Sequence, residues 1–276
     1  MIAKPATFSK SRMKLQGSVV LLTGGSRGLG KLMAQELGRR GARLALVARD
    51  KKGLDEVCQL VGPEPDKAFA IVADLTTMDG IRAAAEATYA HFGRVDVLIN
   101  NAGMTNSLEF LQAEPEALAR TVDLNLRAMV VLTRLVAERM ASQHSGYIVN
   151  ITSLAGVVGL TGEATYAATK AAVRLFTFSL RKELAPHGIR LTEMLIGPTE
   201  TELLDQLEAN RYVKGMFDNG RKWGFFVNLR PQRVAVAVAD AIGREQPLVV
   251  LPSRAWWTWL PLQGVARALS QVMTPS

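Results

Sequence analysis

The sequence predicts an α/β fold, with a single doubly wound parallel sheet of about seven strands and helices on both faces. Short runs rich in leucine and β-branched residues alternate with longer helical patterns along the chain. Several short runs are almost continuously apolar, as strands covered on both faces should be. A glycine-rich turn follows the first run and precedes a helical pattern.

The elements are expected in a regular order. The strand candidates are Ser18–Thr23, Arg43–Ala48, Ala68–Ala73, Val95–Asn100, Gly146–Thr152, Arg190–Leu195 and Pro247–Leu251. The helix candidates are Gly28–Arg40, Leu54–Val61, Met78–Phe92, Glu116–Gln143 and Thr165–Ala185. Pro115 suits the first turn of the fourth helix. No repeat or low-complexity linker interrupts this order, so residues 1–276 are predicted to form one domain with residues 14–251 as its core.

A long segment separates the sixth strand from the next helix and breaks the alternation. Residues 200–230 would lie beside the carboxyl ends of the strands, where an open α/β sheet binds ligands. The segment is rich in large apolar side chains: Leu203, Leu204, Met216, Phe217, Trp223, Phe225 and Phe226. Two interpretations stay open, a lid over an apolar substrate and a helix packed on the core.

Composition excludes several classes of protein. The net charge of +8 is compatible with an anionic partner, but a basic surface without a specific partner is favoured. The chain has no run of five like charges, so it lacks a basic arm of the nucleic-acid-binding type. Cys58 is the only cysteine, so no intrachain disulfide forms, which fits the cytoplasm. The three histidines lack metal-ligand spacing, so no metal is expected. Neither a secretory signal nor an apolar run long enough to cross a bilayer is evident.

The glycine-rich turn predicts a dinucleotide site of the Rossmann type. Its sequence is Thr23-Gly24-Gly25-Ser26-Arg27-Gly28-Leu29-Gly30. Glycines permit a sharp turn and close approach of the backbone to a pyrophosphate, and the N-terminus of the next helix offers free N–H groups. The position between a strand and a helix is the context that this motif requires.

The end of the second strand favours NADP(H). Ala48 stands at the tip, where NAD sites usually have an acidic residue, and Arg49 follows it. Together with Arg27 it offers two guanidinium groups that suit a ribose 2′-phosphate. The alternative is that both arginines are solvated and that Asp50 binds the ribose of NAD.

Tyr166 and Lys170 are four residues apart on a predicted helix and therefore share one face. A nearby ammonium lowers the pKa of a phenol and makes it a better proton-transfer group. Ser153 follows the fifth strand, thirteen residues before Tyr166. Asn125 lies inside the long fourth helix, and Asn100-Asn101-Ala102-Gly103 ends the fourth strand.

This set of motifs, with Asp74-Leu75 after the third strand, resembles the short-chain dehydrogenase/reductase family over roughly Lys14 to Leu251. The resemblance implies that Tyr166 is the general acid or base and that Lys170 binds the nicotinamide ribose and lowers the tyrosine pKa. It also implies that Ser153 hydrogen-bonds the substrate oxygen and that Asn125 holds a water of a proton relay. The remaining implied cofactor contacts are Asp74 and Leu75 at the adenine, and Asn101, Ala102 and Gly103 along the cleft.

One stretch departs from the family pattern, which has Pro-Gly and then a threonine that reaches the carboxamide. The chain reads Ile196-Gly197-Pro198-Thr199-Glu200-Thr201, which keeps the glycine but replaces the first proline. Both Thr199 and Thr201 are candidates for the carboxamide contact. Gly197 is also expected to contact the cofactor.

The predicted activity is interconversion of a carbonyl and a secondary alcohol with NADP(H). An apolar substrate is expected, such as an acyl thioester or a steroid-, retinoid- or polyketide-like ketone. The alternative is a nucleotide-sensing regulator or scaffold on the same fold. The resemblance implies a homodimer or homotetramer. In the tail, residues 252–276, Trp256, Trp257 and Trp259 predict a subunit or cleft contact, with peripheral membrane contact as the second interpretation.

Overall fold

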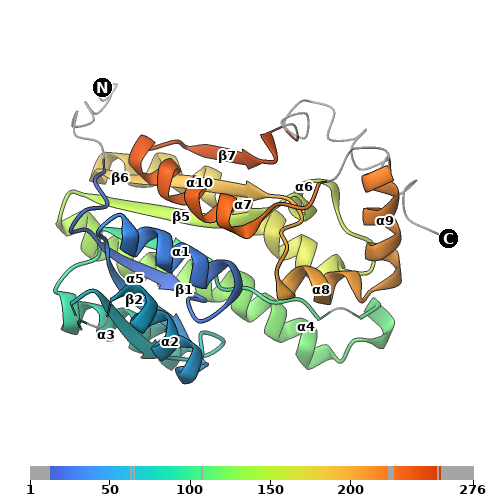
Figure 1. Ribbon diagram of the computed structural model, residues 1–276, viewed down its shortest axis with the longest axis horizontal. Helices are drawn as coiled ribbons and strands as arrows, with labels where there is room; N and C mark the ends of the chain where they lie inside the picture. The colour runs from blue at the N-terminus through green and yellow to red at the C-terminus, as the bar shows by residue number, and fades with distance from the viewer. Residues whose placement is uncertain are drawn as a thin grey trace.

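A seven-stranded parallel sheet forms the centre of the protein, in the strand order β3-β2-β1-β4-β5-β6-β7 (Figure 1). The computed structural model describes residues 13–62, 64, 66–106, 108–222, 227–253 and 255. The strands are β1 (Val19–Thr23), β2 (Arg43–Ala48), β3 (Ala68–Val72), β4 (Val97–Asn100), β5 (Gly146–Ser153), β6 (Ile189–Ile196) and β7 (Leu248–Leu251). The predicted doubly wound sheet is confirmed, and each strand candidate overlaps a strand.

Helices cover both faces of the sheet. They are α1 (Gly28–Arg39), α2 (Lys51–Val61), α3 (Met78–Phe92), α4 (Pro115–Val122), α5 (Ala128–Ser142), α6 (Ala155–Val158), α7 (Ala164–Leu184), α8 (Glu202–Glu208), α9 (Arg211–Lys222) and α10 (Pro231–Arg244). Three shorter helical segments are η1 (Phe110–Gln112), η2 (Asp123–Arg127) and η3 (Ala185–His187). Among the described residues, no helix combines the length and apolar character that a membrane span needs.

The hydrophobic core lies in two layers because alternate strand residues point to opposite faces. Val20 and Leu22 of β1 pack with residues of α1, α2 and α10. Val19 and Leu21 of the same strand pack with residues of α3 and α5. Burial on both faces explains why the strands are almost continuously apolar.

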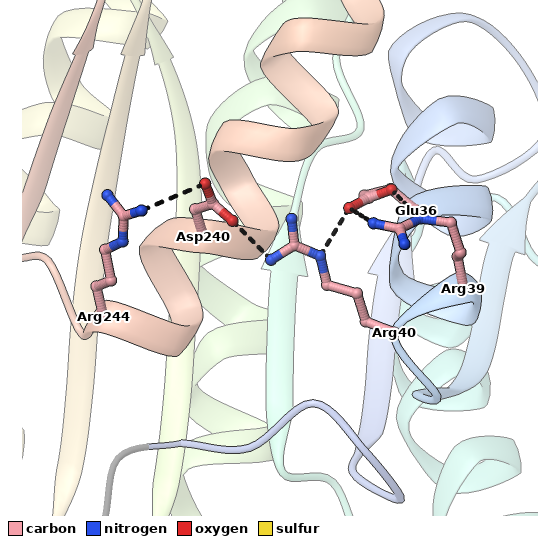
Figure 2. Close-up of polar contacts among 5 residues, drawn as sticks. All are labelled: Glu36, Arg39, Arg40, Asp240 and Arg244. Atoms are coloured by element: carbon pink, nitrogen blue, oxygen red, sulfur yellow. Dashed lines mark hydrogen bonds and ion pairs between the residues drawn. The ribbon is translucent and has the colours of Figure 1, made fainter.

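A network of charged side chains joins α1 to α10 on one face of the sheet (Figure 2). Glu36 accepts hydrogen bonds from Arg39 and Arg40. The Arg40 guanidinium also lies 2.7 Å from the carboxylate of Asp240, which pairs in turn with Arg244. Pairs this close to solvent contribute little individually, but the network adds a polar link to the apolar contact between the two helices. It helps to fix α1, whose N-terminus borders the glycine turn.

Two predicted helices differ from the structure. The segment Glu116–Gln143 is not one α-helix, because the five residues of η2 form a π-helical turn between α4 and α5. Such a turn inserts an extra residue and reorients the side chains within it. Helix α2 begins at Lys51 rather than Leu54, because the Asp50 carboxylate caps it and accepts a hydrogen bond from the Gly53 N–H at 3.1 Å.

The segment after β6 forms α8 and α9 beside the carboxyl ends of the strands (Figure 1). Leu204, Met216 and Phe217 are buried in a cluster that includes Tyr166. The segment therefore packs on the protein and also borders the site. Trp223, Phe225 and Phe226 lie outside the described residues, as do the three tail tryptophans at positions 256, 257 and 259.

Candidate active site

A cavity of about 490 Å³ extends across the carboxyl ends of the strands. Its walls come from the turns after β1 to β6 and from α8 and α9. Most of the predicted site residues line it: Gly24, Ser26, Arg27, Gly28, Leu29, Gly30, Arg49, Asp74, Leu75, Asn101, Ala102, Gly103, Ser153, Tyr166, Lys170, Gly197, Thr199 and Thr201. Thr23 and Asn125 do not line this cavity, because both are buried and make their contacts within the protein.

The glycine turn has the shape of a phosphate cradle. A Cβ atom on Gly30 would lie 1.9 Å from the carbonyl oxygen of Gly24, so only glycine permits this approach of helix to turn. Gly28 has φ +53°, and a Cβ there would meet no atom within 4 Å. The turn thus leaves open space next to the first helix N–H groups of α1. These features fit a dinucleotide pyrophosphate.

Thr23 is buried behind the cradle and holds the next loop in place. Its hydroxyl oxygen accepts hydrogen bonds from the backbone N–H groups of Asn101 and Ala102, each at 3.0 Å. The Asn101 side chain returns a bond, donating to the carbonyl oxygen of Thr23 at 3.0 Å. These contacts give Thr23 a positioning role, and its predicted cofactor contact stays a prediction. Thr23 keeps the turns after β1 and β4 at a fixed separation.

The charged side chains near the end of β2 both face the cavity. Arg49 and Asp50 are exposed and line it, and Asp50 also caps α2 through Gly53. Arg27, the other predicted phosphate ligand, forms an ion pair with Glu202 at 2.9 Å. Glu202 is the first residue of α8, so this pair crosses from the glycine turn to the segment after β6.

Asp74 is an ionised carboxylate at the end of β3. It accepts hydrogen bonds from the backbone N–H of Thr76 at 2.9 Å and from the Thr76 hydroxyl at 2.8 Å. These bonds, with a smaller effect of the Arg49 charge, lower the pKa of Asp74. An acceptor-only group is therefore held at the edge of the cavity, as the predicted adenine contact requires.

Tyr166, Lys170 and Ser153 all line the cavity. Tyr166 and Lys170 lie on the first turns of α7 and are both buried. Ser153 ends β5 and hydrogen-bonds the Tyr166 side chain. The Lys170 ammonium donates a hydrogen bond to the carbonyl oxygen of Ile151 at 3.1 Å and lies 5.8 Å from the centre of the Tyr166 ring.

The pKa values of this pair differ from the expectation that Lys170 lowers the pKa of Tyr166. Burial raises the pKa of Tyr166 to about 12, although its hydrogen bond to Ser153 acts in the opposite direction. Burial also lowers the pKa of Lys170 to about 8. Loss of hydration penalises both the phenolate and the ammonium, so the uncharged forms are favoured at both positions.

Asn125 lies in the π-helical turn and connects two parts of the site. Its side-chain oxygen accepts a hydrogen bond from the Met104 N–H at 2.8 Å. Its side-chain nitrogen donates to the Met104 carbonyl at 2.9 Å and to the Thr169 hydroxyl at 3.2 Å. Asn125 therefore fixes the loop after β4 against α7. The predicted water-binding role of Asn125 stays a prediction.

The two threonine candidates after β6 lie close together. The Thr199 hydroxyl donates to the carbonyl oxygen of Gly197 at 3.0 Å, and the Thr201 hydroxyl donates to that of Thr199 at 3.2 Å. Both residues line the cavity. Either hydroxyl retains acceptor capacity for a cofactor amide, so the choice between them stays open.

One end of the cavity is apolar. Its lining residues there are Leu154, Val158, Leu160, Leu203, Leu204, Leu207, Met216 and Phe217. They come from the N-cap of α6, from α6 itself, from the turn after it and from α8 and α9. Such a wall suits an apolar ligand. Among the described residues, no group of three or more His, Cys, Asp or Glu side chains is placed to hold a metal ion.

Sequence analysis missed three buried polar residues around the turn before α7. The Asn210 side chain donates to the carbonyl oxygen of Gly162 at 3.2 Å and accepts from the Tyr212 N–H at 3.0 Å. Thr105 donates to the carboxyl group of Glu163. Isolated polar residues of this kind match no motif, and only the three-dimensional contacts identify them.

A family model described as short chain dehydrogenase matches residues 18–212. The chain belongs to this family. Its members are oxidoreductases, so the identification that rested on the glycine turn and on Tyr166 and Lys170 is confirmed.

Several individual proteins are similar to this member of the family. It is 35% identical over 196 residues to the 3-oxoacyl-[acyl-carrier-protein] reductase of Synechocystis sp., covering 71% of this chain and 79% of that one. It is 31% identical over 249 residues to dehydrogenase/reductase SDR family member 7B of Bos taurus, covering 88% and 75%.

Two similar solved structures contain different nicotinamide cofactors. A short-chain dehydrogenase from Sphingobium yanoikuyae in complex with NADPH superposes with a TM-score of 0.76 at 32% identity, covering 92% of this chain and 95% of that one. The 3-ketoacyl-(acyl-carrier-protein) reductase from Brucella melitensis, complexed with NADH, gives a TM-score of 0.73 at 32% identity, covering 86% and 95%. Cofactor choice in this dehydrogenase therefore has to be argued from its own residues.

Proposed function

We propose that this short-chain dehydrogenase interconverts a carbonyl compound and a secondary alcohol with NADP(H), and that its substrate is apolar. One observation carries the proposal. The side chains of Ser153 and Tyr166 line a single cavity that is also lined by the glycine turn and by apolar residues of α6, α8 and α9. A proton donor that shares a cavity with a dinucleotide site and an apolar wall suits reduction of an apolar ketone.

The chain contributes proton transfer and electrostatic stabilisation. A bound nicotinamide supplies or accepts hydride at the carbonyl carbon. In reduction, Tyr166 donates its phenolic proton to the substrate oxygen, and Ser153 donates a hydrogen bond to the same oxygen. Both groups act where negative charge develops. With a pKa of about 12, the Tyr166 phenol stays protonated at neutral pH and is ready to act as the acid.

The preference for NADP(H) rests on Arg49 and Arg27. Arg49 follows Ala48 at the tip of β2 and lines the cavity, and Asp50 lines it too while one of its carboxylate oxygens caps α2. Arg27 would exchange its exposed partner Glu202 for the ribose 2′-phosphate, a dianion that offers a stronger charge-assisted bond.

Substrate class and assembly are also proposed. The apolar wall and the similarity to 3-oxoacyl-[acyl-carrier-protein] reductases support a ketone on an acyl chain. Leu175 and Phe178 are exposed on α7, three residues apart, which supports assembly into a homodimer or homotetramer. We further propose that residues 200–230 act as the substrate lid, because α8 and α9 form the apolar wall.

Spectroscopic measurement of NADPH loss tests the activity. The purified chain is assayed against apolar ketones, 3-oxoacyl thioesters and aldehydes, with matched polar ketones for comparison. We expect turnover of apolar ketones or thioesters with a lower KM than for polar ones. NADPH binding without turnover of any carbonyl would instead indicate a nucleotide-sensing regulator.

A further inference from the structure

A buried carboxyl group lies next to the catalytic helix. Glu163 immediately precedes α7, and its backbone carbonyl accepts a hydrogen bond from the Ala167 N–H at 2.9 Å, so it begins the first turn. Its side chain is enclosed, with only 1% of the residue exposed. Burying a carboxyl group is costly and calls for an explanation.

Glu163 joins two walls of the site. The Thr105 hydroxyl donates a hydrogen bond to Glu163 Oε2, and Thr105 is itself buried. Thr105 follows Met104, which lines the cavity and is held by Asn125. The bond therefore connects the loop after β4 to the start of α7, three residues before Tyr166. Glu163 is the N-cap residue of α7 and Tyr166 is three residues later, so both side chains lie at the same end of this helix.

Within the part of the chain that the structure describes, few other charges act on the Tyr166 phenol. The side chains that pack around it from α8 and α9 are apolar, and Ser153 on β5 is neutral. Lys170 is the neighbouring cation on α7, but its pKa of about 8 makes it neutral over the range in which Tyr166 ionises. Other charged residues line the cavity from the glycine turn, the ends of β2 and β3 and the start of α8: Arg27, Arg49, Asp50, Asp74 and Glu202.

We propose that Glu163 is a positioning residue for proton transfer, whose buried carboxylate opposes formation of the Tyr166 phenolate and keeps the proton-donating form of the enzyme populated. This inference rests on the proposed function. In a medium of low dielectric, a carboxylate close to a phenol repels the phenolate strongly. The Glu163 charge indeed acts with burial to raise the pKa of Tyr166. Reduction would therefore continue to higher pH, and oxidation would begin later.

A matched pair of variants separates the effect of the Glu163 charge from the effect of its hydrogen bond to Thr105. Glu163→Gln removes the charge but keeps an oxygen that can accept the Thr105 hydrogen bond. Thr105→Val removes that bond but keeps the carboxyl group. A third variant, Tyr166→Phe, is combined with each so that the absorbance of the Tyr166 tyrosinate is obtained as a difference. Circular dichroism at every pH restricts the comparison to folded protein.

Ultraviolet titration of the full chain without ligand is the first test. In Glu163→Gln, the midpoint of the Tyr166 tyrosinate signal should fall by about one pH unit. In Thr105→Val it should stay at the parent value. An unchanged or higher midpoint in Glu163→Gln would overturn the inference. An equal fall in both variants would also overturn it, because loosening of the loop would then explain the effect.

The pH profile of ketone reduction is the second test. Glu163→Gln should lose activity at a lower pH than the parent, with the KM for NADPH unchanged. A uniform fall in kcat without a shift of the alkaline limb would contradict the inference and indicate a purely structural role. If the parent turns over no carbonyl, the proposed function fails, while the tyrosinate titration still decides the role of Glu163.

Discussion

The Arg27 guanidinium lies 2.9 Å from the Glu202 carboxylate and joins the glycine turn to the first turn of α8. The two side chains are 69% and 62% exposed. An exposed pair of this kind contributes about 0–1 kcal/mol, so a phosphate can displace the carboxylate at little cost. The pair therefore holds the Arg27 guanidinium near the cradle while leaving it able to bind a phosphate.

The two arginines should determine the choice of cofactor. Arg49→Ala should lower kcat/KM with NADPH by about 10- to 100-fold and leave the value with NADH almost unchanged, because the lost contact is to the 2′-phosphate. Arg134→Ala is a control, since Arg134 is an exposed residue of α5 that pairs only locally with Glu138. Equal losses with both cofactors in Arg49→Ala would contradict the NADP(H) preference.

Removing the charge of Glu202 should strengthen NADPH binding. In Glu202→Gln, Arg27 no longer has a competing anion, so the Kd for NADPH should fall by about two- to fivefold. The gain should shrink at high salt, where exposed charges are screened. Fluorescence titration with NADPH at two ionic strengths measures this. Weaker binding in Glu202→Gln would show that the pair supports the bound state instead.

The glycine turn should not tolerate a side chain at Gly30, where helix α1 comes closest to the turn. Gly30→Ala places a methyl group 1.9 Å from the Gly24 carbonyl oxygen. It should lower the free energy of unfolding by about 1–3 kcal/mol and abolish cofactor binding. Gly243→Ala is the matched control in α10, where an added Cβ meets no atom within 4 Å. This variant should be neutral or stabilise the chain by about 0.5–1 kcal/mol. Denaturant unfolding measures both, and similar behaviour of the two variants would contradict the cradle geometry.

Stability should depend on pH through Lys170. Its pKa falls from 10.5 to about 8 on folding, so the unfolded chain binds more protons between these values. The contribution of Lys170 to stability therefore rises with pH across this window. Relative to Lys170→Met, the parent should gain on the order of 3 kcal/mol between pH 7 and pH 10.5. Urea unfolding at both pH values measures the difference, and a constant difference would mean that the ammonium is hydrated in the folded protein.

Much of the fold could be predicted because its signals are local. The nearly continuous apolar runs reflect burial on both faces, and the glycine turn requires residues without a Cβ. The spacing of Tyr166 and Lys170 placed them on one face of α7, where the structure has both lining the cavity.

What could not be predicted depends on distant contacts or on burial. No residue pattern marks the π-helical turn around Asn125. Glu163 and Thr105 are 58 residues apart, and Arg27 meets Glu202 only after folding. The direction of the Tyr166 pKa shift also follows from its enclosure, which residue spacing cannot reveal.

Replacing the phenolic hydroxyl tests the central claim most directly. Tyr166→Phe removes the proton donor and its hydrogen bond to Ser153 but keeps the ring within the α8 and α9 cluster. With an apolar ketone that the parent reduces, kcat should fall by about 100- to 10,000-fold while the Kd for NADPH stays within about twofold. Near-parental turnover by Tyr166→Phe would contradict the assignment of Tyr166 as the acid.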